Sequence, residues 1–228
     1  MTNFFIQHNY ARLNGDIVGQ SKDALTDDHL VQLWTLLAQH YSTTDGIMFG
    51  IMNEPHDLDT GLWAETAQKV VTAIRDTGAI AQPIILPGSN WTHLINFEEW
   101  YPYLKGIHNP DGSTTGLIFD LHHYMDSDDS GRNAECVVNT LDSFVMVQKI
   151  LFTDKRQAIV TEMGGGNNLK CSKELNSQLT FLHSYPDQFV GFSAWSAGSI
   201  SVDSSVTLTP VNGVDQLLWT ASIKKFLS

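Results

Sequence analysis

The stretch Gly-Ile-Met-Asn-Glu-Pro at residues 50–55 ends a short apolar run with a carboxylate, that of Glu54. The stretch Ile-Val-Thr-Glu-Met-Gly-Gly-Gly at residues 159–166 does the same with Glu162, 108 positions further along the chain. Only a fold that gathers the ends of its strands brings two such residues together. A barrel of parallel strands does so, because the carboxyl ends of all its strands surround one opening.

The composition indicates a single α/β domain over residues 1–228, because 42% of the residues are hydrophobic and only 17% are charged. Asp and Glu outnumber Lys and Arg by 25 to 13, and the net charge of −12 repels nucleic acid and anionic lipid. No apolar run approaches the roughly 20 residues of a membrane span. We therefore expect no nucleic-acid or membrane partner, and a neutral polymer or small neutral ligand instead.

Short apolar runs recur along the chain at intervals of 32 to 43 residues, which is the spacing of repeated strand-loop-helix units. The runs begin near Phe4, Ile47, Ile84, Leu117, Ala158 and Val190. They are apolar nearly throughout, as expected of parallel strands that are buried on both faces.

Helical periodicity appears between these runs, and the apolar residues of each stretch share one face. The first face holds Leu30, Leu33, Trp34, Leu37 and Tyr41, the second Trp63, Ala67, Val70, Val71 and Ile74, and a later one Leu175, Leu179 and Leu182. Thr26, followed by two aspartates, predicts the start of the first helix. These helices are expected to cover the outside of a parallel sheet.

A polar or aromatic side chain follows or lies in each of the six predicted strands, at the same end of the sheet. The candidates, in chain order, are His8, Asn53 and Glu54, Asn90 and Trp91, His122 and Tyr124, Glu162, and Trp195. One strand-end His or Trp alone is more often a packing residue. Six together predict a site for a polar ligand with flat apolar faces, which describes a pyranose ring.

Several other features favour ordinary structural explanations. The run Gly164–Gly166 lacks the Lys-Ser/Thr of a phosphate loop and predicts a tight turn. The segment from Asp126 to Asp129 lacks the spacing of a calcium loop and predicts a solvated acidic loop. His122 and His123 are adjacent, hence on opposite strand faces, which argues against one shared metal. We expect neither a metal nor a cofactor.

The chain has two cysteines, Cys136 and Cys171, outside any metal-binding pattern. Each lies a dozen or so residues past a predicted strand, so a disulfide is geometrically reasonable, and two unrelated buried thiols are only somewhat less favoured. The opening Met1-Thr-Asn lacks the basic and apolar parts of a signal peptide.

The motifs together resemble glycoside hydrolase family 5. The resemblance rests on Asn53-Glu54-Pro55, His122-x-Tyr124, Thr161-Glu162 and Trp195. The stretches at residues 8–12, 109–115 and 161–166 look particularly like the fungal endo-β-1,4-glucanases of that family. The resemblance covers essentially the whole chain.

The resemblance implies a (β/α)8 barrel fold and a retaining mechanism on cellulose or a related β-glucan. It implies that Glu54 is the acid/base and Glu162 the nucleophile. Asn53 is then expected to bind a sugar hydroxyl and Tyr124 to donate to Glu162. His8 and His122 are expected to orient carboxylates or hydroxyls. Trp195 and, to a lesser extent, Trp91 are expected to stack on sugar rings. Asn90 is also expected to bind substrate. It also implies secretion and a disulfide between Cys136 and Cys171.

The start of the chain differs from that family pattern, because family members begin with two further β/α units, one of which supplies a site arginine. We therefore expect an incomplete, TIM-barrel-like (β/α)6 arrangement that corresponds to units three to eight. Its seam, between the strands near Phe4 and Val190, would expose strand edges. Two copies are expected to close that seam as a homo-oligomer, the alternative being a smaller, closed six-stranded barrel.

Three functions stay open on the sequence alone. The first is a retaining endo-β-1,4-glucanase, favoured by both glutamates and the surrounding shell. The second is a non-catalytic or weakly active glucan-binding remnant. The third is a β-mannanase of the same family, because acceptance of an axial 2-hydroxyl depends on loops that the sequence does not resolve.

Overall fold

The computed structural model describes residues 3–21, 25–137, 141–198 and 204–227. The chain forms two compact units, residues 1–120 and 121–228, and each is described by itself. Strand β6 (Leu117–Tyr124) begins in the first unit and ends in the second. The expectation of a single domain over residues 1–228 stays a prediction.

The first unit is built on parallel strands in the order β1-β4-β5-β6. These strands are β1 (Asn3–Ile6), β4 (Ile47–Gly50), β5 (Ile84–Leu86) and the first half of β6. Phe4 lies opposite Met48, and Ile84 lies between Phe49 and Leu117. All residues of β4 and β5 are buried, which confirms the expectation drawn from their apolar runs.

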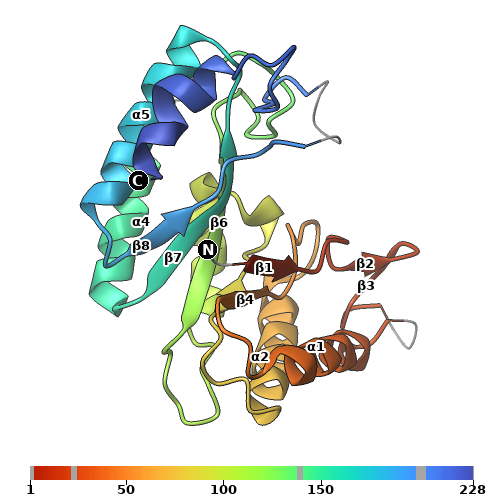
Figure 1. The fold of residues 1–228 in the computed structure, drawn as a ribbon. Coiled ribbons are helices and arrows are strands. Elements are labelled where there is room, and N and C mark those ends of the chain that lie inside the picture. Colours follow the sequence, from red (N-terminus) through yellow and green to blue (C-terminus); the bar gives the residue numbers. More distant parts are fainter. Residues whose placement is uncertain (1–2, 22–24, 138–140, 199–203, 228) are drawn as a thin grey trace. The chain divides into compact units, whose positions relative to one another are not determined.

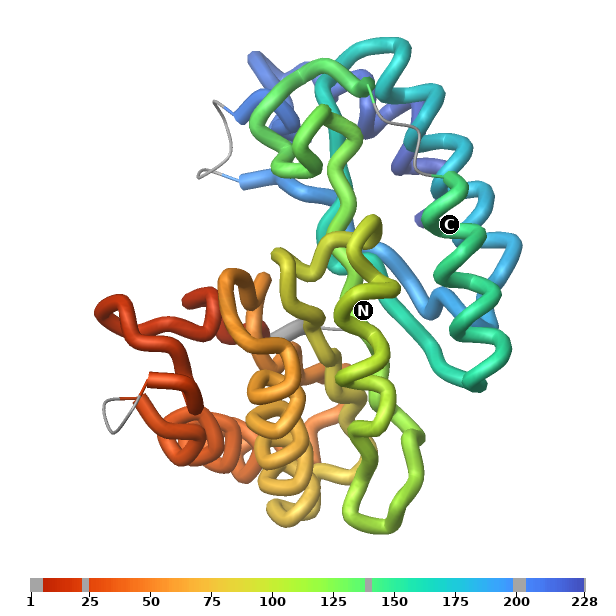
Figure 2. The backbone as a smooth tube through the Cα atoms, turned by 180° about the vertical axis from the view of Figure 1, so that it is seen from behind, coloured from red at the N-terminus to blue at the C-terminus, as the bar shows by residue number. Residues whose placement is uncertain are grey.

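The helices of the first unit bury the predicted apolar faces only in part. They are α1 (Asp27–Tyr41), α2 (Thr60–Asp76) and α3 (Phe97–Leu104), and a small hairpin joins β2 (Arg12–Leu13) to β3 (Asp16–Ile17). Helices α1 and α2 lie side by side, as Figures 1 and 2 both show. The predicted face of α2 is fully buried, whereas Leu33 of α1 is 36% exposed.

Two buried tryptophans fasten these helices to the sheet through the indole N–H. Trp34 of α1 donates to the carbonyl oxygen of Ile51, and Trp63 of α2 donates to that of Pro87. Each indole therefore buries a large apolar surface without leaving its single donor unpaired.

A buried arginine near the end of α2 binds the loops that precede β5 and β6. The guanidinium of Arg75 donates to the side-chain oxygen of Asn109 and to the backbone oxygens of Ala79 and Gln82. Burial lowers the pKa of Arg75, since desolvation disfavours its charge. Asn109 belongs to the stretch 109–115 that resembles the fungal enzymes, so this part of the resemblance has a structural role.

The second unit continues the sheet order β6-β7-β8, with β7 (Gln157–Gly164) and β8 (Phe189–Phe192). Strands β7 and β8 are parallel, with a register irregularity between Ala158 and Val160. Helices α4 (Leu141–Asp154) and α5 (Leu169–Ser184) pack side by side on this sheet (Figure 1). The last turns, η4 (Trp219–Ile223) and η5 (Lys224–Phe226), lie along α5.

The six predicted strand positions are confirmed, each within one residue of an observed strand start. At either end of the sheet order a strand has one described neighbour: β1 pairs with β4, and β8 pairs with β7. Among the described residues, no helix is both long and apolar enough to cross a bilayer.

A disulfide joins Cys136 to Cys171, with 5.3 Å between their Cα atoms. The pairing implied by the family resemblance is therefore confirmed. Cys171 lies in the first turn of α5, where its backbone N–H donates to the capping side chain of Asn168. The bond thus anchors the loop after β6 to the start of α5.

The buried face of α2 generates a stability prediction. Ile74→Ala removes a fully buried side chain and should lower the free energy of unfolding by about 2 to 5 kcal/mol. Leu62→Ala on the same helix, at a position 42% exposed, is the matched control and should cost less than about 1 kcal/mol. Urea unfolding followed by circular dichroism measures both, and equal losses would contradict the assigned helix face.

Candidate active site

The predicted site residues divide between the two units. The first unit carries His8 after β1, Asn53 and Glu54 after β4, and Asn90 and Trp91 after β5. The second unit carries His122 and Tyr124 at the end of β6, Glu162 on β7, and Trp195 after β8. Each lies at or near the carboxyl end of its strand. Trp195 was expected within the last strand, but β8 ends at Phe192.

Glu162 is the centre of the second group and is only 9% exposed. The hydroxyl of Tyr124 donates to its Oε2 at 2.6 Å. His122 Nδ1 lies 3.7 Å from the same oxygen, and His122 Nε2 lies 3.0 Å from Thr161 Oγ1. A hydrogen bond donated to a carboxylate favours its ionised form, so the arrangement suits a nucleophilic carboxylate.

Glu54 lies on a strained loop of the first unit, because its φ of 45° is in the left-handed region. The preceding Asn53 is 2% exposed, and its side-chain nitrogen has no hydrogen-bond partner in the described part of the chain. A buried amide N–H without a partner is costly, so a ligand oxygen that accepted from it would relieve that cost.

Arg12 holds the loop that follows Glu54. Its Nη2 donates to the backbone oxygens of His56 and Asp57, at 2.6 and 3.1 Å, and its Nη1 donates to that of Tyr10 at 3.0 Å. One guanidinium thus ties the loop after β1 to the loop that carries Glu54. From the sequence, Arg12 was noted only as the last residue of the stretch 8–12, and nothing in the sequence pattern indicated this role.

An aromatic cluster surrounds Trp91 in the first unit. The Trp91 ring stacks on His56 with 3.5 Å between centroids and 6° between planes. Tyr10 meets both rings edge-on at 5.6 Å, and His8 lies 5.5 Å from Tyr10. One face of Trp91 is therefore already occupied, so only its other face is left for a ligand. Tyr10 and His56 are the cluster members that the list of candidates missed.

Asn90 interacts with the first turn of α3 rather than standing alone at the strand end. Its side-chain nitrogen donates to Glu99 Oε2 at 2.8 Å. Asn90, Trp91 and Thr92 all have φ between 54° and 60°, which places three consecutive non-glycine residues in the left-handed region. The sequence gives no sign of this strained turn.

Three glycines at the end of β7 are required by close packing. A Cβ at Gly164 would lie 2.7 Å from the carbonyl oxygen of Trp195, and one at Gly166 would lie 2.1 Å from that of Ala134. The run was predicted to form a tight turn. Backbone from neighbouring loops packs directly against the run, and just after it the Asn168 N–H donates to the Gly166 oxygen at 2.8 Å, which closes a turn.

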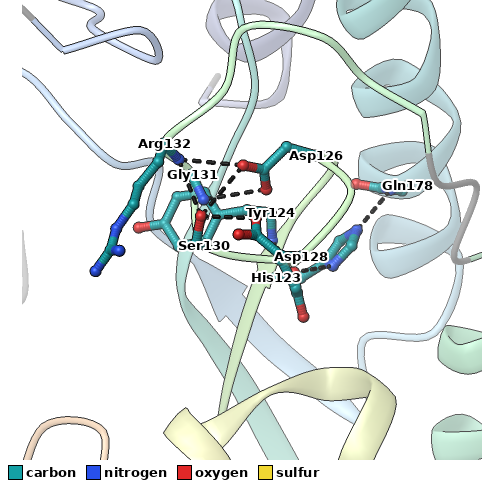
Figure 3. Close-up of polar contacts among 9 residues, drawn as sticks. His123, Tyr124, Asp126, Asp128, Ser130, Gly131, Arg132 and Gln178 are labelled. Carbon is teal, nitrogen blue, oxygen red and sulfur yellow. Dashed lines mark hydrogen bonds and ion pairs between the residues drawn. The ribbon is translucent and has the colours of Figure 1, made fainter.

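The loop between β6 and α4 is buried at its core, contrary to the expected solvated acidic loop. Asp126 is 2% exposed and Asp129 5% exposed. The Asp126 carboxylate accepts from the backbone N–H groups of Gly131 and Arg132, each at 3.1 Å (Figure 3). It also accepts from the backbone N–H of Asn133 at 3.1 Å. Burial alone would raise the pKa of Asp126, but these hydrogen bonds outweigh it and lower the pKa below its usual value.

Comparison with known proteins agrees with the geometry of the strand ends. The model of a family described as cellulase (glycosyl hydrolase family 5) matches residues 7–198. Endoglucanase EG-II of Hypocrea jecorina is 44% identical over 216 residues, which make up 93% of this chain and 51% of that protein. The chain therefore spans about half the length of this relative.

Solved structures show the same fold. Cel5A (EG2) from Hypocrea jecorina (Trichoderma reesei) superposes with a TM-score of 0.91 at 41% identity, covering 96% of this chain and 68% of that one. XacCel5A, in a structure with cellopentaose, superposes with a TM-score of 0.89 at 28% identity, covering 98% and 72%. The predicted fold class, an incomplete TIM-barrel-like α/β fold, is thereby confirmed.

The Asp126 carboxylate generates a prediction about stability and pH. The pKa of Asp126 is lower in the folded protein than in the unfolded chain, where it is about 3.9. The contribution of Asp126 to the free energy of unfolding is therefore complete above the unfolded pKa and is lost as the pH falls through the folded pKa. Asp126→Asn should therefore lower the free energy of unfolding at pH 7 by about 1.5 to 3 kcal/mol, the value of one hydrogen bond to a charged group.

The gap between Asp126→Asn and wild type should narrow as the pH is lowered from about 5 towards 2.5, in denaturant titrations at each pH. Asp128→Asn, in the same loop but exposed, is the control and should change little. A gap that stayed constant across this range would contradict the assigned role of the charge.

Proposed function

Since the chain belongs to glycosyl hydrolase family 5, we propose that it is a retaining endo-β-1,4-glucanase that hydrolyses cellulose or a related β-glucan. The observation that carries the proposal is the hydrogen bond from the Tyr124 hydroxyl to Glu162, with His122 beside the same oxygen. A carboxylate held by a donated hydrogen bond in a largely buried position is suited to attack at carbon.

We assign Glu162 as the nucleophile and Glu54 as the acid/base. One oxygen of Glu162 forms a bond to the anomeric carbon while the bond from that carbon to the leaving oxygen breaks. Glu54 gives its proton to the leaving oxygen in this step. In the second step Glu54 takes a proton from water, the water oxygen bonds to the anomeric carbon, and Glu162 leaves as a carboxylate, so the configuration is retained.

The remaining residues are assigned to substrate binding. The unpartnered side-chain nitrogen of Asn53 suits donation to a sugar hydroxyl. Trp195 and the open face of Trp91 suit stacking on pyranose rings. His8 is exposed beside Tyr10 and suits a hydroxyl further along the chain of sugars. Asn90 is retained in the set, although Glu99 already accepts from its amide.

Support for the substrate class comes from the relatives. The Hypocrea jecorina relative is named an endoglucanase, and XacCel5A has a structure with cellopentaose. A β-1,4-linked glucan oligosaccharide is therefore the first substrate to test. Because the two glutamates lie in different compact units, the proposed mechanism requires both units to act as one catalytic domain.

The two glutamates should respond differently to substitution. Glu162→Gln should abolish most turnover on every substrate, because no carboxylate is left to attack carbon. Glu54→Gln should lose about 10²- to 10⁴-fold on β-glucan. It should be partly rescued on aryl cellobiosides with nitrophenol leaving groups, because the first step then needs no proton while the second step still lacks its base. Glu65→Gln, an exposed position on α2, is the control.

The measurement is initial rates on barley β-glucan, a soluble cellulose derivative, mannan and a nitrophenyl cellobioside. Equal losses for the two variants on every substrate would contradict the assignment of roles. Turnover of mannan alone would favour the β-mannanase. Binding of cellopentaose by calorimetry without any turnover would favour the glucan-binding remnant.

We also propose secretion and self-association. The disulfide between Cys136 and Cys171 supports an oxidising, extracellular location. The edges of β1 and β8, each with one described neighbour, support pairing of two copies through exposed backbone groups.

Self-association is tested by sedimentation velocity across a hundredfold dilution series. We expect a dimer that dissociates on dilution, because paired strand edges of neutral backbone form a reversible interface. A single monomeric species at every concentration, with no dye-binding apolar surface, would contradict it and favour the closed six-stranded barrel.

A further inference from the structure

Tyr124 is held by the loop that follows it. Strand β6 ends at Tyr124, and the chain then turns through Asp126 and Asp129 before Val137 N–H donates to the Met125 oxygen and closes the loop. The Asp126 carboxylate accepts from the backbone N–H groups of residues 131–133 and so fixes the loop's path; Figure 3 shows the contacts with Gly131 and Arg132. The loop contributes no residue to the proposed chemistry itself.

Asp129 connects this loop to the end of β6. One of its oxygens, Oδ1, accepts from the backbone N–H of Tyr124 at 2.5 Å and from His123 Nδ1 at 3.0 Å. His123 Nε2 in turn accepts from Gln178 Nε2 on α5 at 3.1 Å. That contact leaves the imidazole proton on Nδ1, where it donates to Asp129. All three side chains are buried.

The Tyr124 ring is enclosed by two glycines. A Cβ at Gly131 would lie 2.6 Å from the ring, so the loop backbone packs directly on the aromatic face. A Cβ at Gly164 of β7 would lie 3.6 Å from it. With its N–H bound by Asp129 and its ring enclosed, Tyr124 has little freedom to move, and its hydroxyl lies on Glu162 Oε2.

We infer that Asp129 is a positioning residue of the active site, which acts through Tyr124 to hold the donated hydrogen bond on Glu162. The inference rests on the proposed function for its catalytic consequence. The Asp129 carboxylate acts on the end of β6, where it binds the backbone N–H of Tyr124 and the imidazole of His123. Its effect passes along the backbone of Tyr124, whose hydroxyl is the group that reaches the nucleophile.

The direction of the effect separates this role from a simple effect of charge. Considered by itself, the loss of the negative charge of Asp129 makes Glu162 easier to ionise and moves the Glu162 titration midpoint to lower pH. Loosening the Tyr124 hydroxyl removes a hydrogen bond that favours the ionised carboxylate and moves the midpoint to higher pH. Two other titratable groups also face Glu162: His122 in the same unit, and Glu54 in the proposed mechanism. Every variant keeps both, so that their effect on the Glu162 midpoint stays constant.

The experiment is a carbon-13 NMR titration of the Glu162 carboxyl in the free protein, with the resonance assigned by its loss in Glu162→Gln. We expect Asp129→Ala to raise the midpoint by about half to one pH unit, towards the value of Tyr124→Phe. Asp129→Asn keeps an acceptor oxygen and should show a smaller rise. Asp129→Ala added to Tyr124→Phe should cause no further rise, because the hydroxyl through which Asp129 acts is already gone.

Asp128→Asn, at an exposed position in the same loop, is the control and should titrate as wild type. An unchanged or lowered midpoint in Asp129→Ala, or an equal shift in the Tyr124→Phe background, would overturn the inference. If Asp129→Ala does not fold, Asp129→Asn decides by the same sign: a rise supports the inference, and no change or a fall overturns it.

Hydrolysis of β-glucan gives the catalytic readout. Asp129→Ala should lose about 10- to 100-fold in kcat with little change in KM, since it misplaces a group at the nucleophile and leaves the sugar contacts in place. A rise in KM with unchanged kcat would overturn the catalytic part. If the wild-type protein hydrolyses no glycan, the proposed function fails, while the titration still decides whether Asp129 positions Tyr124.

Discussion

A parallel strand buried on both faces offers a polar side chain to a ligand only where the strand ends, and this constraint organises the molecule. The interiors of β4, β5, β6 and β7 are almost wholly buried. Asn53, Tyr124 and Glu162 therefore lie at or near strand ends, where the sheet gives way to loops. The loops must then do two things at once: leave room for a ligand, and hold side chains whose geometry the strands no longer fix.

In each unit, one charged side chain holds such a loop in place by binding several of its backbone groups. In the first unit the Arg12 guanidinium collects three backbone oxygens around the loop of Glu54. In the second unit the Asp126 carboxylate collects three backbone N–H groups around the loop beside Tyr124. A charged side chain that satisfies several backbone groups stabilises an irregular path that no regular hydrogen-bond ladder supports.

Much of this arrangement could be predicted from the sequence, because it depends on periodicity and on short motifs. The strand positions, the buried face of α2, the contact of Tyr124 with Glu162 and the Cys136–Cys171 bond are all found as predicted. The opposite directions of His122 and His123 also follow from strand alternation. The strand positions and the buried helix face require only that local pattern and fold class agree, whereas the disulfide was predicted from the family resemblance.

The remainder depends on contacts between distant loops, for which a sequence pattern carries no signal. Asp126 and Asp129 look like solvated acids until the path of residues 130–133 is known. Trp91, on which His56 stacks, lies in a left-handed turn that tryptophan and threonine rarely adopt. The glycines at 164 and 166 predicted a turn, but nothing in the sequence indicated that backbone atoms of residues 195 and 134 pack against them.

The disulfide has a practical consequence for how the protein is produced. Cys136 closes the same loop that carries Asp126 and Asp129, and Cys171 anchors it to α5. A bacterial cytoplasm keeps thiols reduced, so protein from that host would retain its strands and helices but lack this covalent tie. Preparations from different expression hosts would then differ in how firmly this loop is held, and a thiol count should accompany every comparison of variants.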